Sequence, residues 1–226
     1  YKRGLNSEWG RPKYAFLNPE LTYSVSPYQT ASGSADIMMH TLERFFHSGE
    51  GLTLTDDLSV SLLKSVMAYT PIALSDPKNY EARANLMWAG SLSHNGLMNM
   101  GSDSRGDWAC HQMEHELSAK YDCPHGAGLT AIWGSWARYV FPSIKERLVI
   151  LGEKLFSLEG ESDEVAEKTI DEMEKFFSSI SMPVTIKELG IELSEEDIES
   201  LSFGATFHGK RTLGDSFRLG GKEISD

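Results

Sequence analysis

The segment Cys110–Gly126 reads CHQMEHELSAKYDCPHG and contains three of the seven histidines of the chain. A helix is predicted over Asp107–Asp122, and a proline two residues further on is expected to end it. In such a helix, His111 and His115 lie one turn apart on the same face. The turn after the proline allows His125 to come back toward the helix axis. The segment therefore predicts a helix, a sharp turn and a cluster of three imidazoles.

The spacing of these histidines is compatible with a metal site and also with a purely structural cluster. Two imidazoles at positions i and i+4 can hold a divalent ion, and neutral imidazole suits zinc or iron. The zinc-protease motif HExxH is absent, because Ala119 stands where its second histidine would follow Glu116. A single histidine on an amphipathic helix is usually a surface residue or a hydrogen-bonded core residue. Spacing alone leaves both interpretations open.

A second pair of candidate ligands lies much earlier in the chain. Asp36 and His40 are one helical turn apart in GSADIMMH, residues 33–40. A carboxylate and an imidazole on an otherwise apolar, methionine-rich helix are costly to bury unless a partner satisfies them. A metal ion would satisfy both. Asp36 and His40, with two of the three later histidines, would form a shell of one oxygen and three nitrogens.

The composition is that of a globular protein and argues against several classes of function. Hydrophobic residues make up 40% of the 226 residues and charged residues 24%, as in ordinary soluble domains. The net charge of −12 argues against a nucleic-acid partner, because phosphate binding needs clustered lysine and arginine. No apolar run reaches the roughly 20 residues that span a bilayer, and the first residues lack the apolar stretch of a signal peptide. We therefore expect a cytoplasmic protein that does not enter a membrane.

The two cysteines fit this expectation. Cys110 and Cys123 form no CxxC motif, so they indicate neither a disulfide framework nor a zinc ribbon. We interpret both as packing residues in a reducing compartment.

Periodic apolar residues predict a chain that is mostly helical. The first helix begins at Ser26-Pro27 and has Ala31, Ala35, Met38, Met39, Leu42 and Phe46 on its apolar face. Thr55-Asp56-Asp57 is expected to cap the second helix. Further helices are predicted over residues 80–100, 107–122, 144–157 and 162–180, and another is expected to start near residue 126. Short helices are predicted over residues 185–191 and 194–201.

One segment predicts a strand instead. Lys13–Leu17, KYAFL, is a short apolar run closed by the turn signal NPE. An isolated strand has nothing to pair with, so its partners are expected in a portion that precedes residue 1. The predicted fold class is all-α with one leftover N-terminal strand.

Two motifs in this chain resemble those of the iron-containing (group III) alcohol dehydrogenases, within them the butanol dehydrogenase branch. The first motif of that family, an aspartate and a histidine four residues apart after small residues, is similar to TASGSADIMMHTLE, residues 30–43. The second, a histidine followed by others at +4 and +14, is similar to HQMEHELSAKYDCPHG, residues 111–126. The stretches NYEARANLMWAGSLSHNGL and DWACHQMEHELSA also resemble this branch. The likeness covers nearly the whole chain.

The resemblance implies a metal site and gives the histidines different roles. In the family pattern the first and last histidines of the second motif are ligands, so the expected ligands are Asp36, His40, His111 and His125. The middle histidine lies toward nicotinamide and substrate, so His115 is expected to relay protons. The ion is expected to be Fe²⁺ or Zn²⁺, since this ligand set accepts either. It would act as a Lewis acid on an alcohol or aldehyde oxygen during hydride transfer with NAD(P)H.

The resemblance also implies a protein of two domains with a dehydroquinate synthase-like fold. Residues 1–25 are expected to be the end of an N-terminal nucleotide-binding α/β domain and a linker. Residues 26–226 are expected to be the all-helical, metal-binding catalytic domain. NAD or NADP is expected to bind mainly to the N-terminal domain, because the SGS at 32–34 follows no strand–turn–helix unit. We expect a homodimer, and we expect this chain alone to be inactive.

The expected function is thus the NAD(P)H-dependent interconversion of small primary alcohols and aldehydes. A helical phosphohydrolase of the HD type is disfavoured, because no His-Asp dipeptide occurs in the sequence. An alternative from another class is a binding or regulatory module in which a metal only stabilises the fold.

Overall fold

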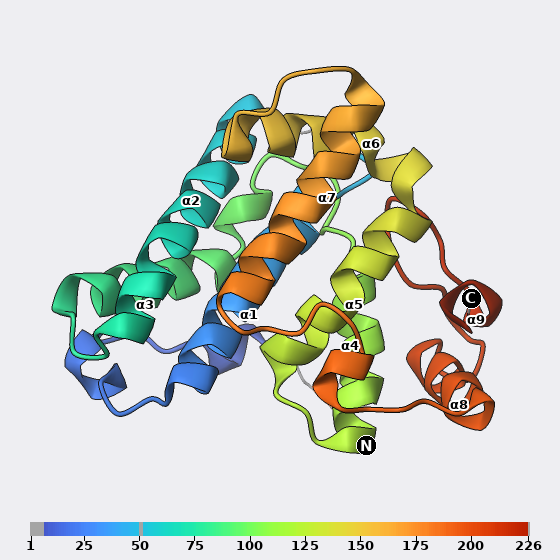
Figure 1. The fold of residues 1–226 in the computed structure, drawn as a ribbon, viewed down its shortest axis with the longest axis horizontal. Coiled ribbons are helices and arrows are strands. Elements are labelled where there is room, and N and C mark those ends of the chain that lie inside the picture. Colours follow the sequence, from blue (N-terminus) through green and yellow to red (C-terminus); the bar gives the residue numbers. More distant parts are fainter. Residues whose placement is uncertain (1–6, 50–51, 226) are drawn as a thin grey trace.

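The computed structural model describes residues 7–49 and 52–225, which form helices joined by loops (Figure 1). Short helical turns are η1 (Glu8–Gly10), η2 (Pro19–Thr22), η3 (Leu97–Asn99) and η5 (Lys187–Leu189), and η4 (Gly152–Phe156) is a π-helical turn. The α-helices of the described residues are α1 (Pro27–Phe45), α2 (Thr53–Ser75), α3 (Tyr80–His94), α4 (Ala109–Tyr121), α5 (His125–Tyr139), α6 (Phe141–Leu151), α7 (Ser162–Ser179), α8 (Glu195–Ala205) and α9 (Gly221–Ser225).

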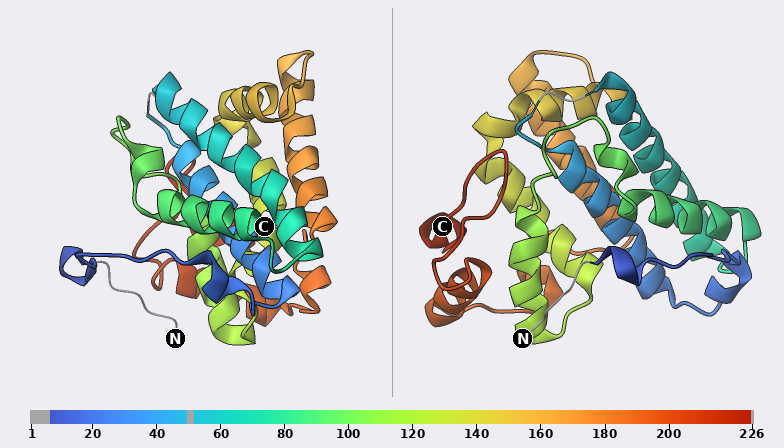
Figure 2. Two further views of the ribbon diagram at one scale, coloured as in Figure 1. Left: turned by 90° about the vertical axis from the view of Figure 1, so that its left-hand side faces the viewer. Right: turned by 180° about the vertical axis from the view of Figure 1, so that it is seen from behind.

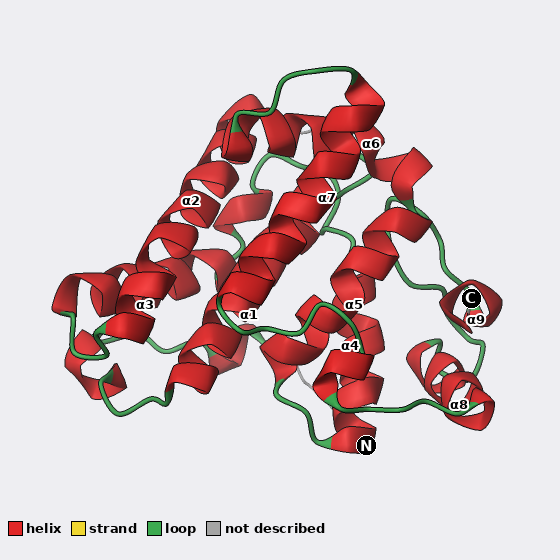
Figure 3. Ribbon diagram, in the orientation of Figure 1, coloured by secondary structure: helices red, strands yellow, loops and turns green. Residues whose placement is uncertain are grey.

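The predicted N-terminal strand is wrong. Residues 13–17 are irregular, and no strand occurs in the part of the chain that the structure describes (Figure 3). Tyr14 and Phe16 of this segment are almost fully exposed. A strand needs a neighbour to accept and donate its backbone hydrogen bonds, and no described segment lies alongside this one as a partner strand. The only β-type pairing among the described residues is a single bridge between Leu213 and Leu219.

Helix α1 forms the centre of the fold. It packs against α2, α3 and α5, and the view from behind shows it in the middle of the molecule, with α5 on one side and α2 and α3 on the other (Figure 2). Ser26 caps it by accepting a hydrogen bond from the backbone N–H of Gln29, and Pro27 fits its first turn. The residues predicted for its apolar face are all buried: Ala31, Ala35, Met38, Met39, Leu42 and Phe46. The prediction of this helix and its buried face is confirmed.

Helix α2 begins earlier than its predicted cap. It starts at Thr53, and its N-cap position carries no side-chain cap. Asp56 does not cap it, because both carboxylate oxygens accept hydrogen bonds from Arg147 on α6, at 2.7 and 2.6 Å. Arg147 also donates to the backbone carbonyl of Phe45 at the end of α1. This buried ion pair therefore joins three helices.

Helix α2 is long and apolar enough to cross a membrane, judged by length and composition alone. Here it packs against α1 and α3, and one face of it is buried, including Val60, Leu63 and Val66. A core helix of a helical domain passes the same test of length and composition.

Helix α3 ends sooner than the apolar pattern predicts. Its last residue is His94, and Gly96 follows with a φ of 87°, a left-handed conformation that ends helices. This early end leaves the His94 side chain at the C-terminal end of α3, close to α1.

Candidate metal centre

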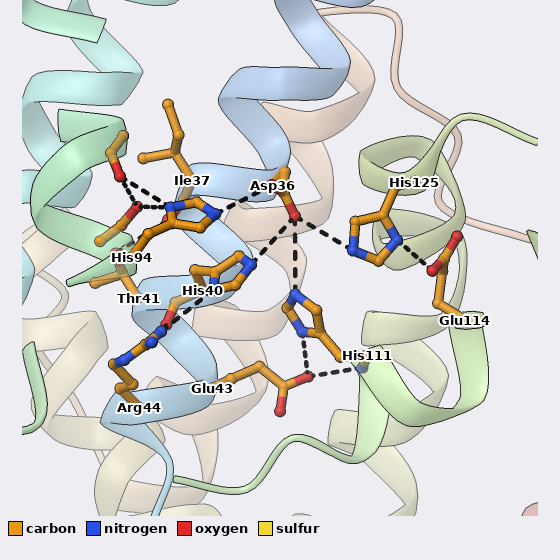
Figure 4. A network of polar contacts seen from close by, with 12 residues as sticks. Asp36, Ile37, His40, Thr41, Glu43, Arg44, His94, His111, Glu114 and His125 are labelled. Carbon is orange, nitrogen blue, oxygen red and sulfur yellow. Dashed lines mark hydrogen bonds and ion pairs between the residues drawn. The ribbon is translucent and has the colours of Figure 1, made fainter. Parts of the chain in front are cut away.

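The structure brings the four predicted ligands together around one carboxylate. Oδ1 of Asp36 lies 3.8 Å from Nε2 of His40, 3.8 Å from Nε2 of His111 and 3.6 Å from Nε2 of His125. Asp36 and His40 come from α1, His111 from α4, and His125 is the first residue of α5 (Figure 4). Residues far apart in the sequence thus converge on a single point.

The unsatisfied polar atoms at this point fit a cation. Oδ1 of Asp36 and Nε2 of His111 are buried and make no hydrogen bond within the described residues. Leaving such atoms without a partner is costly. Their separation of 3.8 Å is too long for a hydrogen bond. It is close to the roughly 3.5 Å between two atoms that share one ion at bond lengths near 2 Å. One carboxylate oxygen and several imidazole nitrogens suit Zn²⁺ or Fe²⁺.

Two buried glutamates lie behind the histidines and orient their rings. Oε1 of Glu43 lies 3.2 Å from Nδ1 of His111, and Oε2 of Glu114 contacts Nδ1 of His125. Both carboxylates are almost fully buried. Since a carboxylate accepts from a protonated Nδ1, each Nε2 is the nitrogen that faces Asp36 and is the one available to a metal. This carboxylate–histidine arrangement is typical of metal sites.

A further histidine, His94, reaches the same carboxylate from α3. Its Nε2 lies 3.5 Å from Oδ2 of Asp36, and its ring stacks on that of His40 with centroids 3.7 Å apart. Within the described residues, two groups of potential ligands share Asp36, one with His40 and His94 and one with His111 and His125. No motif in the sequence indicated a role for His94.

The ring of His40 is held differently from the others. Its Nδ1 lies 3.3 Å from a nitrogen of Arg44, which also donates a 2.8 Å hydrogen bond to the backbone carbonyl of His40. The Arg44 guanidinium in turn lies over the ring of Trp108, 4.6 Å from its centroid. A guanidinium only donates, so the contact between Arg44 and Nδ1 of His40 needs an unprotonated Nδ1. If Nε2 of His40 binds a metal, the proton of the ring is on Nδ1. Arg44 then loses this contact and keeps its hydrogen bond to the His40 carbonyl.

Without a metal, the electrostatics of the cluster favour a charged His111 beside a neutral His40 and an ionised Asp36. Burial disfavours a charged His111, but its contacts with Asp36 and Glu43 raise the pKa of this histidine to about 9. Burial and the neighbouring charge of His111 lower the pKa of His40 to about 2. Burial also opposes ionisation of Asp36, yet its contacts with His111 and His94 hold the pKa of this carboxyl well below its usual range. An arriving cation would therefore replace a proton held by His111.

His115 lies beside the cluster on the solvent side. It is exposed, and its ring centroid is 5.4 Å from that of His125 and 6.4 Å from that of His111. Its nearest potential metal partners are Glu114 and His125, which form a separate group with it. This position differs from those of the four predicted ligands, and the role expected for His115 stays a prediction.

Close backbone packing fixes the position of His125. A Cβ on Gly126 would lie 1.9 Å from the backbone oxygen of Ser32 on α1, and one on Gly128 would lie 2.8 Å from the side chain of Glu114. Glycine at these two positions lets α5 approach both α1 and α4 closely. The start of α5 therefore brings His125 to Asp36.

The sequence offered a signal for only some of the residues found here. Glu43 follows Asp36 by seven positions, so helical periodicity places it on the same face of α1. Glu114 and His94 carried no comparable signal, because their partners lie on other helices.

The fold and this cluster define a helical domain with a carboxylate-and-histidine ligand set. Residues 30–219 match the C-terminal part of the Fe-containing alcohol dehydrogenase family, and the chain belongs to that family. The corresponding expectation from the sequence is confirmed.

Relatives with similar sequences carry dehydrogenase and reductase names. The chain is 37% identical over 216 residues to NADH-dependent butanol dehydrogenase A of Clostridium acetobutylicum, covering 94% of this chain and 54% of that protein. It is 29% identical to the NADPH-dependent aldehyde reductase YqhD of Escherichia coli, covering 95% and 55%. The crystal structure of NADH-dependent butanol dehydrogenase A from Thermotoga maritima superposes with a TM-score of 0.91 at 30% identity, covering 98% and 56%. The chain thus spans about half the length of the relatives it matches.

Proposed function

We propose that this chain is the metal-binding half of an NAD(P)H-dependent enzyme that interconverts primary alcohols and aldehydes. The observation that carries the proposal is the convergence of three histidine nitrogens on one oxygen of Asp36, at 3.6 to 3.8 Å. The names of the relatives, butanol dehydrogenase and aldehyde reductase, support the same reaction class.

The proposed ligands are Asp36, His40, His111 and His125, and Fe²⁺ and Zn²⁺ both suit them. When bound, such an ion supplies Lewis acidity toward an alcohol or carbonyl oxygen. Glu43 and Glu114 keep Nδ1 of His111 and His125 protonated and their rings oriented. His115, exposed beside His125, is proposed to exchange a proton between the substrate side and solvent.

A nucleotide-binding domain is proposed as the partner of this helical domain, with the boundary near residue 25. We propose that this partner binds most of the nicotinamide cofactor. The chain alone is then expected to show no oxidation of NAD(P)H with an aldehyde. Robust turnover by this polypeptide alone would contradict the proposed division of labour.

The substitution Asp36→Asn tests the proposal, because it keeps the shape of the side chain and removes its charge. In the full-length protein we expect loss of bound metal and of aldehyde reduction, with a circular dichroism spectrum like that of the wild type. A variant that unfolds would favour the alternative of a metal that only stabilises the fold. Full activity in protein stripped of metal would refute a metal-dependent reaction.

A further inference from the structure

We infer that His94 is a fifth protein ligand of the metal centre, which rests on the proposed function of the site. The three expected histidine ligands lie around Oδ1 of Asp36, whereas Nε2 of His94 lies 3.5 Å from the other oxygen, Oδ2. His94 thus reaches the carboxylate from a side that none of the other histidines occupies (Figure 4).

The hydrogen bonds of His94 orient its ring so that Nε2 is available to a metal. Its Nδ1 lies 2.9 Å from the backbone carbonyl oxygen of Gly90 and 2.8 Å from Oγ of Ser93. A carbonyl only accepts, so the proton of the neutral ring is on Nδ1. The hydroxyl of Ser93 donates to the same Gly90 carbonyl at 3.0 Å, which leaves its oxygen free to accept from Nδ1. Nε2 therefore faces Asp36 with a lone pair.

Two acceptors that face each other at this distance repel unless a positive charge lies between them. The lone pair of His94 and the carboxylate of Asp36 form such a pair. A cation bound at Asp36 removes the repulsion and gains a nitrogen ligand. The competing explanation is a protonated His94 that forms an ion pair with Asp36 and never contacts the metal.

The arrangement of the neighbouring ring favours direct ligation. The rings of His40 and His94 stack with an interplanar angle of 34°, and both Nε2 atoms face the Asp36 carboxylate. Nδ1 of His94 faces a hydrogen-bond acceptor, and so do Nδ1 of His111 and Nδ1 of His125. A site with four nitrogens and one carboxylate favours metals that prefer nitrogen ligands over Mg²⁺ or Mn²⁺.

Titration with Co²⁺ tests the inference in the full-length protein, because its visible absorption reports the number of ligands. The wild type is expected to bind one Co²⁺ per chain. The variant His94→Ala is expected to bind it about 10-fold or more weakly, with stronger visible absorption because the coordination number falls. Added imidazole is expected to restore the wild-type spectrum, which a merely structural role of His94 would not permit.

The matched control is His208→Asn, which removes an exposed imidazole outside the cluster. Asparagine tolerates the positive φ of 63° at that position. Its spectrum and affinity should equal those of the wild type. Because the His94 side chain is 43% exposed, circular dichroism should show that His94→Ala remains folded.

Three results would overturn the inference. An unchanged spectrum and affinity in His94→Ala would leave His94 outside the coordination shell, while the proposed four-ligand site would stand. Two Co²⁺ per wild-type chain, with one lost in His94→Ala, would assign His94 to a second ion. Absence of Co²⁺ binding in the wild type would instead refute the proposed function itself, and with it the fifth ligand.

Discussion

Oε1 of Glu43 accepts two hydrogen bonds from His111, one from the backbone N–H at 3.0 Å and one from the ring Nδ1 at 3.2 Å. One buried carboxylate thus fixes both the start of α4 and the ring that α4 presents to Asp36. Position and orientation of this proposed ligand depend on the same atom.

Replacing Glu43 by glutamine should weaken metal binding without unfolding the protein. The amide oxygen of Glu43→Gln can still accept both hydrogen bonds, but the negative charge that makes His111 a stronger ligand is lost. We expect the metal affinity to fall roughly 10- to 100-fold, measured by competition with a chromophoric chelator. Glu164→Gln, an exposed charge on α7, is the matched control and should leave the affinity unchanged. Equal affinities of Glu43→Gln and the wild type would show that the charge has no role.

Adding one methyl group at Gly126 should disturb both the fold and the metal centre. Its Cβ would lie 1.9 Å from the backbone oxygen of Ser32, so α5 must shift away from α1. We expect Gly126→Ala to lower the free energy of unfolding by about 1–3 kcal/mol and to weaken metal binding. Gly33→Ala on α1 is the control, because nothing lies within 4 Å of its Cβ. It should be neutral or stabilise by about 0.5–1 kcal/mol. Equal stability of the two variants in urea would contradict the proposed tight contact.

The buried ion pair of Asp56 and Arg147 should contribute to stability and not to metal binding. Asp56→Asn would leave the half-buried guanidinium without its charged partner, although its bonds to the carbonyl of Phe45 remain. The expected loss in the free energy of unfolding is about 3–5 kcal/mol, with metal stoichiometry unchanged. The neighbouring Asp57→Asn removes an exposed pair with Lys154 and should cost no more than about 1 kcal/mol. Similar losses for the two variants would show that burial of the Asp56 pair is irrelevant.

Asp215 should make the protein sensitive to acid. Its Oδ2 accepts hydrogen bonds from the backbone N–H of Ser48 at 2.9 Å, from the Ser48 hydroxyl at 2.8 Å and from the Ser104 hydroxyl at 2.7 Å. Burial opposes ionisation, but these bonds and the charge of Arg218 hold the pKa of Asp215 below its usual value of 3.8. The folded state therefore favours the charged form. Its contribution is fully present above the pKa of the unfolded chain and is lost as the pH falls through the lower pKa of the folded state.

The variant Asp215→Asn makes this dependence measurable. At neutral pH it should be less stable than the wild type by about 1–3 kcal/mol, because hydrogen bonds to a charged group are lost. The difference should shrink as the pH falls below about 4, in urea unfolding at a series of pH values. Asp171→Asn, at a side chain that is 69% exposed, is the control. A stability difference that stays constant down to pH 2 would rule out a lowered pKa at Asp215.

The sequence predicts the helices of this fold better than their ends. The apolar spacing of Ala35, Met39 and Leu42 recurs with the helical period, and Ser26-Pro27 defines the start of α1 by local chemistry. The end of α3 depends on the left-handed conformation of Gly96. The start of α2 differs from the prediction because the Asp56 side chain binds Arg147 and does not cap the helix. Such tertiary partners cannot be read from neighbouring residues.

The same limit applies to the metal centre. Spacing within one helix identified Asp36 with His40 and His111 with His115, and His125 followed after the proline turn. A family resemblance then selected His111 and His125 as ligands. The partner of Glu114 lies on another helix, and His94 approaches from α3. Contacts between helices depend on packing, which a pattern of residues within one helix does not contain.

The convergence of α1, α3, α4 and α5 on the Asp36 carboxylate has a consequence for how the chain holds together. An ion bound there would act as a removable crosslink between segments distant in sequence, and would close long chain loops in the way a disulfide does. Unlike a disulfide, its strength would be set by concentration, adding about 4 kcal/mol when the free ion exceeds its dissociation constant a thousandfold. The melting temperature of this domain would then serve as a gauge of how much metal its surroundings supply.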